Sequence, residues 1–189
     1  MDSHANKTHI CPWWLGYFLI SPIRKFIHDP HSLLVPYIKE GMTVLEIGPG
    51  MGFFSLPLAR LVGKKGKVVC VDVQEKMLRQ LNRRGTKAGL QDRIVTVLAS
   101  EDSLRLAPFE GSVDFTLAFA VVHEIPDQNR LLEETYRAMK PGSRLLVSEP
   151  KGHVTEDAFN KTIAIALAKG FKVETPVDIR QSISMIFGK

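Results

Sequence analysis

Three glycines in the first third of the chain are the residues whose spacing most directly predicts chemistry. Gly48, Gly50 and Gly52 follow a short apolar run, residues 43–47, whose length and branching predict a buried strand. Glycine has no Cβ, so a turn built this way lets a ligand approach bare backbone. The helix expected to begin near Gly52 points its unpaired N–H groups at that ligand. The pattern therefore predicts a nucleotide-binding turn.

The spacing of the glycines and two nearby acids narrow the choice of nucleotide. In a G-x-G-x-x-G dinucleotide fingerprint the third glycine would stand where this chain has Phe53. Glu46 precedes the glycines, and its negative charge would repel a pyrophosphate but suits a ligand that carries a cationic amine. Asp72 ends the next apolar run, 67–71, where an acid can accept hydrogen bonds from both ribose hydroxyls. These features disfavour an NAD(P)-dependent dehydrogenase.

The resulting pattern, E-x-G-x-G-x-G followed by an acid after the second strand, resembles motif I of the class I S-adenosyl-L-methionine (SAM)-dependent methyltransferases. The resemblance is firm over residues 43–150 and looser beyond them. Within the family, the pattern is similar to that of small single-domain enzymes of the quinone-biosynthesis type. It implies SAM as the cofactor. The cofactor-binding residues that it implies are Glu46, Gly48, Gly50, Gly52, Asp72, Val73, Met77, Ser100, Glu101 and Phe119.

The resemblance assigns the later of these positions to the two ends of SAM. Ser100 and Glu101 follow the third apolar run, where the family holds an acidic residue against the adenine amino group. The usual glycine-aspartate-alanine is absent there, so either side chain can make the contact. Phe119 falls where family members contact the methionine half. Residues 118–121 lack the N/D-P-P-Y/F motif of enzymes that methylate base amino groups in nucleic acid, which disfavours that substrate class.

His123 and Glu124 are the candidate catalytic residues, because they follow the fourth run at the sheet edge where a substrate would lie. An imidazole titrates in the right range to remove a proton from a hydroxyl, an amine or an acidic carbon. In the alternative interpretation His123 bonds loop backbone and Glu124 faces solvent. Glu149 and His153, after the fifth run, are weaker candidates of the same kind. No base is compulsory, since the SAM methyl group is already activated.

The elements that must position these residues alternate regularly. Helical signals at 74–87 and 127–140 separate some of the apolar runs, and this alternation predicts a doubly wound, Rossmann-like, mostly parallel α/β sheet. Two closely spaced segments near the end, 171–179 and 182–187, predict an antiparallel hairpin after a helix capped by Thr155. With the resemblance, this predicts a seven-stranded sheet. The apolar runs are 43–47, 67–71, 94–98, 113–120 and 144–148.

The basic residues of the segment 74–87 lie apart from its apolar positions, so we expect them to face solvent rather than form a binding patch. They are Lys76, Arg79, Arg83 and Arg84.

Residues 1–42 differ from the rest and are predicted to form a helical, aromatic extension to a SAM-binding domain at 43–189. Asp29 and Pro30 predict the N-cap and first position of a short helix that Pro36 strains and Gly41 ends. The extension is either an arm packed on the core or a lid over the cofactor, and its entry beside the first strand favours the lid. Its aromatic cluster comprises Trp13, Trp14, Tyr17, Phe18 and Phe26.

Length and composition limit the number of domains, the cellular location and the kinds of partner that we expect. A chain of 189 residues is about one domain. The two cysteines, Cys11 and Cys70, give no disulfide framework, which favours a reducing, cytoplasmic location. The apolar run 12–20 is too short to span a bilayer. The net charge of +5 comes from scattered residues and does not indicate nucleic acid. His4, His9 and Cys11 match no zinc spacing, so we expect no metal.

The sequence thus predicts a SAM-dependent methyltransferase that acts on a small-molecule acceptor, with the oligomeric state left open. The alternative from another class is a non-catalytic SAM-binding or RNA-binding protein on the same scaffold. The two differ in whether S-adenosylhomocysteine forms.

Overall fold

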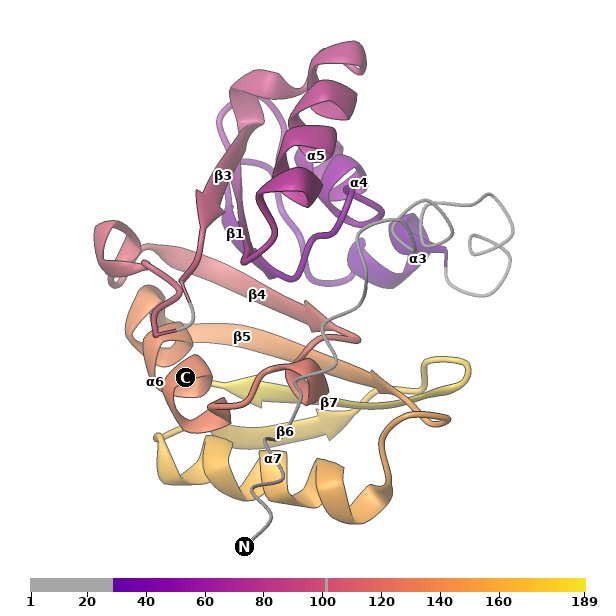
Figure 1. The fold of residues 1–189 in the computed structure, drawn as a ribbon, viewed down its shortest axis with the longest axis vertical. Coiled ribbons are helices and arrows are strands. Elements are labelled where there is room, and N and C mark those ends of the chain that lie inside the picture. The colour runs from indigo at the N-terminus through magenta and orange to yellow at the C-terminus, as the bar shows by residue number, and fades with distance from the viewer. Residues whose placement is uncertain (1–28, 101) are drawn as a thin grey trace, which may run out of the picture.

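The computed structural model describes residues 29–100 and 102–189 (Figure 1). Within them the chain forms a seven-stranded sheet of order β3-β2-β1-β4-β5-β7-β6. Parallel pairing joins β3 to β2, β2 to β1, β1 to β4 and β4 to β5, whereas β7 is antiparallel to both β5 and β6. The predicted fold class, a doubly wound mostly parallel sheet that ends in an antiparallel hairpin, is confirmed. The strands are β1 (Thr43–Ile47), β2 (Lys67–Asp72), β3 (Ile94–Leu98), β4 (Val113–Phe119), β5 (Met139–Pro150), β6 (Lys172–Pro176) and β7 (Ser182–Gly188).

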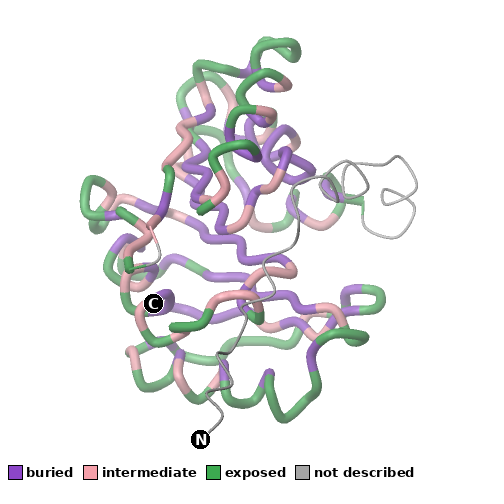
Figure 2. The backbone as a smooth tube through the Cα atoms, in the orientation of Figure 1, coloured by how far each residue is buried: buried purple, intermediate pink, exposed green. Residues whose placement is uncertain are grey.

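Helices cover both faces of the sheet (Figure 1). On one face Leu58 and Leu81 pack in a core cluster with Phe115, and on the other Leu132 and Phe159 pack around Leu145. Figure 2 shows that the buried residues follow the central strands, while the outer turns of the helices are exposed. The α-helices are α3 (Pro30–Leu34), α4 (Ser55–Leu61), α5 (Glu75–Lys87), α6 (Gln128–Ala138) and α7 (Glu156–Ala168), and the short 3₁₀ turns are η2 (Gln91–Arg93), η3 (Ala107–Phe109) and η4 (Val122–Glu124).

Several predicted boundaries differ from the structure. The helix expected over 127–140 ends at Ala138, because Met139 already pairs with Val113 and begins β5 five residues before the predicted strand. Near the end of the chain the predicted strand 171–179 shortens to β6, which lies at the sheet edge and is exposed along its length. Phe171 instead turns into the core, where its ring contacts that of Phe187.

The described part of the N-terminal segment packs on the sheet. Asp29 accepts hydrogen bonds from the backbone N–H groups of His31 and Ser32, as expected of an N-cap. The predicted end at Gly41 is wrong: α3 ends at Leu34, because Pro36 has no N–H group to continue the helical hydrogen bonds. Tyr37 stacks on Phe115 at 5.5 Å between ring centroids. The aromatic cluster and its predicted role as a lid lie outside the described residues.

The basic residues of α5 are placed differently from one another. Lys76, Arg79 and Arg83 are exposed, as expected. Arg84 is half-buried, and its Nη1 donates to the carbonyl oxygen of Met51. The prediction that Arg84 faces solvent is therefore wrong, because α5 lies close enough to the glycine turn for this side chain to reach back to it.

Lys189 closes the end of α6, and the C-terminal mark in Figure 1 lies beside that helix. Its Nζ donates to the carbonyl oxygens of Tyr136 and Met139, each at 2.7 Å, and lies 4.5 Å from the centre of the Tyr136 ring. The last carbonyl groups of a helix have no partner within the helix and carry partial negative charge. An ammonium group at this end donates the missing hydrogen bonds and offsets the partial charge.

No helix among residues 29–100 and 102–189 is long and apolar enough to cross a membrane.

We expect Lys189→Met to lower the free energy of unfolding by about 1 to 2 kcal/mol, because it removes two charge-assisted hydrogen bonds at the junction of α6 and β5. Urea denaturation followed by circular dichroism measures the change. Lys172→Met, at an exposed position of β6, removes the same charge and is expected to change stability by less than about 0.5 kcal/mol. Equal effects of the two variants would contradict the assignment.

Candidate active site

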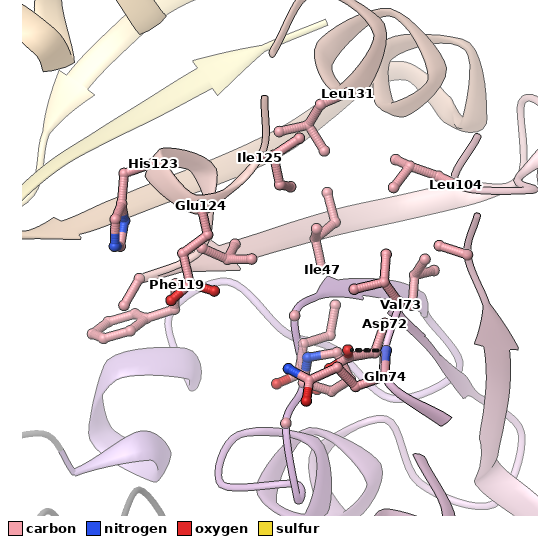
Figure 3. A pocket seen from close by; sticks show the side chains of 18 of the residues that line it. Ile47, Asp72, Val73, Gln74, Leu104, Phe119, His123, Glu124, Ile125 and Leu131 are labelled. Carbon is pink, nitrogen blue, oxygen red and sulfur yellow. Dashed lines mark hydrogen bonds between the residues drawn. The ribbon is translucent and has the colours of Figure 1, made fainter. Parts of the chain in front are cut away.

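A cavity of about 1080 Å³ lies at the carboxyl ends of β1, β2 and β4 (Figure 3). This is the edge of an open α/β sheet at which ligands bind. Figure 3 shows Asp72, Val73 and Gln74 on one side of the cavity, and Phe119, Glu124 and His123 on the other. The predicted site residues on its wall are Glu46, Gly48, Gly50, Asp72, Val73, Met77, Ser100, Phe119, His123 and Glu124.

The three glycines of the turn have different surroundings. All have positive φ, 67° at Gly48, 55° at Gly50 and 87° at Gly52. A Cβ on Gly48 would lie 2.5 Å from Cγ2 of Val121, and one on Gly52 would lie 2.5 Å from Cδ1 of Leu81. A Cβ on Gly50 would meet nothing within 4 Å, and Gly50 lines the cavity. Only the middle glycine thus offers both bare backbone and open space, whereas the outer two let the turn pack against its neighbours.

Asp72 lies at the end of β2 with its carboxylate largely withdrawn from water. Its Oδ1 accepts a hydrogen bond of 2.8 Å from the backbone N–H of Gln74, which Figure 3 marks. Burial raises the pKa of Asp72 to about 6, although backbone N–H groups of Gln74, Gly50 and Val73 favour its ionised form. The charge of Glu124 adds to the increase, so these two carboxylates interact electrostatically. A ligand that donates hydrogen bonds to Asp72 would relieve this cost.

Glu46 and Cys70 lie beneath the glycine turn on neighbouring strands. Glu46 is 3% exposed and contributes to the cavity wall. The thiol of Cys70 lies 3.8 Å from Oε2 of Glu46. Burial raises the pKa of the Cys70 thiol well above its ordinary value, and the charge of Glu46 raises it further.

The far end of the cavity is closed by the segment that follows β3. Ser100 pairs with Ser103 through backbone hydrogen bonds, and Met77 is buried against the cavity from α5. Glu101 lies outside the described residues. Glu134 of α6 holds this segment, because its Oε2 accepts from the N–H of Leu104 at 2.9 Å and from Oγ of Ser103 at 3.1 Å. No pattern in the sequence indicates this role for Glu134, because its partners are 30 and 31 residues away along the chain.

Aromatic rings form the opposite wall. Phe119, at the end of β4, packs against Phe54 with ring centroids 4.6 Å apart, and Phe54 contacts Phe53 edge to face. All three line the cavity. Phe53, which occupies the third position of the dinucleotide fingerprint, is therefore a wall residue here.

His123 is held by a buried carboxylate on the same side of the cavity. Its Nδ1 bonds Oε2 of Glu149, which is 2% exposed. The other oxygen of Glu149 accepts from the backbone N–H groups of Val121 at 3.2 Å and Val122 at 2.7 Å. The hydrogen bond to Glu149 raises the pKa of His123 above 6.5, against the opposing effect of burial. The alternative of a histidine bonded to loop backbone is wrong.

The backbone beside this histidine is strained. Within the described ranges, the residues other than glycine with positive φ are Arg105, Ala120 and Gln181, and Ala120 and Gln181 both line the cavity. Ala120 has φ 54° and connects β4 to η4, and Gln181 has φ 59° and connects β6 to β7. Such strain costs about 1 to 3 kcal/mol and concentrates at functional sites. It supports a function for this end of the cavity.

Comparison with known proteins identifies the family. A family model described as a methyltransferase domain matches residues 38–181. The chain belongs to the methyltransferase domain family. This methyltransferase domain is 32% identical over 136 residues to the ubiquinone/menaquinone biosynthesis C-methyltransferase UbiE of Escherichia coli, a match that covers 71% of this chain and 49% of UbiE. The chain thus spans about half the length of the curated relatives it matches.

Solved structures agree with this family. A SAM-dependent methyltransferase from Aquifex aeolicus superposes on the methyltransferase domain with a TM-score of 0.83 and 27% identity, covering 93% of this chain and 97% of the other. The [4+2]-cyclase SpnF superposes with a TM-score of 0.68 and 20% identity, covering 81% of this chain and 61% of the cyclase, and shows the fold alone. The family, fold class and SAM cofactor predicted from the sequence are confirmed.

We expect SAM binding to weaken as the pH falls through about 6, the pKa of Asp72. A protonated carboxyl group loses acceptor capacity for hydroxyl donors, so affinity should fall by up to about tenfold per pH unit below that value. Isothermal titration calorimetry between pH 5 and 8 measures it. In Asp72→Asn the affinity should be low and flat across the same range.

The free energy of unfolding without ligand should depend on pH in the opposite direction: it should fall as the pH rises, whereas SAM affinity should rise. A pKa raised on folding contributes stability at low pH that is lost as the pH rises through 6. Parallel pH dependence of SAM affinity in the wild type and in Asp72→Asn would contradict the role of this acid.

We expect Gly50→Ala to abolish SAM binding, because its Cβ would occupy the open space beside the turn. Gly89→Ala is a matched control: its φ is 67°, its Cβ would also meet nothing within 4 Å, and it is not part of the cavity wall. Both variants should lose about 1 kcal/mol of stability through backbone strain, while only Gly50→Ala should lose affinity in calorimetric titration. Wild-type affinity in Gly50→Ala would mean that the turn does not meet the cofactor.

Proposed function

We propose that this chain transfers the methyl group of SAM to a small-molecule acceptor that loses a proton in the reaction. The observation that carries the proposal is the position of His123: an imidazole held by a buried carboxylate lies in the same cavity as the glycine turn and Asp72. The cavity joins a nucleotide-binding end to an end able to accept a proton.

The residues on the cofactor side fit SAM in chemistry and space. Gly50 leaves room for a ligand against the backbone, and the buried acid Asp72 suits ribose hydroxyls. We assign Glu46 to the amine of the methionine half. Gly48 and Gly52 support the turn through their packing on Val121 and Leu81. We assign Val73, Met77 and Ser100 to the adenine end and Phe119 to the methionine end, and we retain Glu101 as a prediction for the adenine amino group.

The proposed mechanism assigns one task to each group at the acceptor end. SAM supplies a methyl group activated by its sulfonium charge, so alignment in a site that excludes water provides much of the rate. His123 donates its Nδ1–H to Glu149, which leaves Nε2 to take the proton from the acceptor. Glu149 stabilises the resulting imidazolium. Glu124 places a second negative charge on the cavity wall, where it also favours the imidazolium form of His123.

The relatives support a small acceptor but do not name it for this chain. UbiE is a C-methyltransferase of ubiquinone and menaquinone biosynthesis, and the chain covers about half of it. The wall formed by Phe53, Phe54 and Phe119 suits an apolar molecule, and a hydroxyl, thiol or acidic carbon on it would supply the proton. The use of only two cysteines supports a cytoplasmic location.

The cyclase with the same fold shows why turnover itself must be measured. Incubating the protein with SAM and a panel of phenols, quinols, thiols and amines, and measuring S-adenosylhomocysteine by mass spectrometry, separates the alternatives. An enzyme forms the product with at least one acceptor. A SAM-binding or RNA-binding protein without catalytic activity binds SAM and forms none.

We expect His123→Gln to lower the rate of methyl transfer by about 10² to 10⁴ while SAM affinity stays at the wild-type value, because only proton removal is lost. In the wild type the rate should rise with pH as the imidazole loses its proton. The midpoint should lie above 6.5, since the pKa of His123 is raised.

Glu149→Gln should move that midpoint to lower pH, because the hydrogen bond and charge that raise the pKa of His123 are removed. A full rate in His123→Gln would show that no base is needed. A midpoint unchanged by Glu149→Gln would show that the carboxylate does not tune the imidazole.

A further inference from the structure

The guanidinium of Arg84 is an unusual partner for the glycine turn. Arg84 comes from α5 and donates from Nη1 to the carbonyl oxygen of Met51, the residue between Gly50 and Gly52. Burial lowers the pKa of Arg84, which means that its charged form pays a desolvation cost. No ion pair found in the described part of the chain includes Arg84.

The peptide group that receives this hydrogen bond is fixed from both sides. The carbonyl oxygen of Met51 faces Arg84, while the N–H of Gly52 in the same peptide plane donates to the carbonyl oxygen of Pro49 at 3.0 Å. Because the two polar groups of a trans peptide point in opposite directions, these two bonds together prevent the peptide from rotating. Without these bonds the rotation would be easier, because Gly52 on one side of the peptide has no Cβ to restrict it.

A second contact from the same helix acts on the same turn. The side chain of Leu81 is fully buried and occupies the space where Gly52 lacks a Cβ. Leu81 and Arg84 are three residues apart, so they lie on one face of α5. That helix therefore packs against the turn at Gly52 and hydrogen-bonds it at Met51, on the side away from the ligand.

The energetics favour a role in function over one in stability. A half-buried cation that bonds only a neutral carbonyl recovers little of its desolvation cost, and an unbranched apolar side chain of similar length would fit this position at lower cost. Binding sites commonly retain such destabilising groups because they hold the functional geometry.

We propose that Arg84 is a positioning residue, which locks the glycine turn in the conformation that binds SAM without itself contacting the cofactor. Arg84 is not part of the cavity wall, so its effect passes through the Met51–Gly52 peptide. Locking the turn before binding removes an ordering cost that the ligand would otherwise meet. The inference rests on SAM as the cofactor and is independent of the proposed methyl transfer and of His123.

The test is SAM affinity measured by calorimetry in four proteins: wild type, Arg84→Met, Arg84→Lys and Arg83→Met. Arg84→Met should weaken SAM binding about tenfold, equivalent to about 1.4 kcal/mol. Its thermal midpoint without ligand should equal or exceed that of the wild type, so affinity and stability should separate. Arg84→Lys keeps a donor and should recover part of the affinity. Arg83→Met changes an exposed neighbour and should change neither quantity.

Hydrogen exchange at the Gly52 amide gives a second readout that needs no ligand. In Arg84→Met this amide should exchange faster than in the wild type, while amides in β2 keep their protection. Wild-type SAM affinity in Arg84→Met would overturn the proposal. So would a loss of affinity accompanied by an equal loss of stability and not recovered by lysine, because that result indicates general packing. A failure to find any methyl acceptor would leave these binding results unaffected.

Discussion

The cavity depends on close packing at two glycines of the turn, Gly48 and Gly52. Because Gly48 and Gly52 lack a Cβ, Val121 can pack on the start of the glycine turn and Leu81 on its end. Any larger residue at either position would force the turn away from η4 or from α5. The turn is therefore held at its start by the segment that follows β4 and at its end by α5. Glycine is thus required at these two positions by packing within the protein. At Gly50 a Cβ would meet no protein atom, so packing within the protein does not explain the glycine there.

Glu149 links this packing to the acceptor end. Its carboxylate binds the ring of His123 and also the backbone of Val121, the residue whose side chain covers Gly48. A single buried group at the end of β5 therefore fixes the imidazole and the segment that packs on the glycine turn. A neutral replacement would leave backbone N–H groups of η4 with a weaker acceptor in a buried place, so its effects would reach both ends of the cavity.

The sequence was sufficient for features that depend on local pattern. Alternating apolar runs predicted the parallel strands, and Asp29 predicted a helix start. The glycine spacing with Glu46 and Asp72 predicted residues that the structure brings to one cavity. Contacts between segments that are far apart in the sequence could not be predicted from such local patterns. Glu149 was a weak candidate because nothing in the order of residues brings it to His123 from 26 positions away. Arg84 was expected in solvent because helical periodicity gives the face of a residue but not how far a long side chain reaches.

Cys70 has a consequence for a protein that holds a methyl donor. Its sulfur lies in β2 beside Glu46, which lines the cavity, and a thiolate that reached the methyl donor would compete with the acceptor as a nucleophile. Burial first, and then the neighbouring charge of Glu46, raise the pKa of this thiol well above its ordinary value. The sulfur stays protonated at neutral pH and is then a poor nucleophile. Burial of the sulfur, with the charge of Glu46 beside it, thus keeps a thiol close to the methyl donor in its less reactive form.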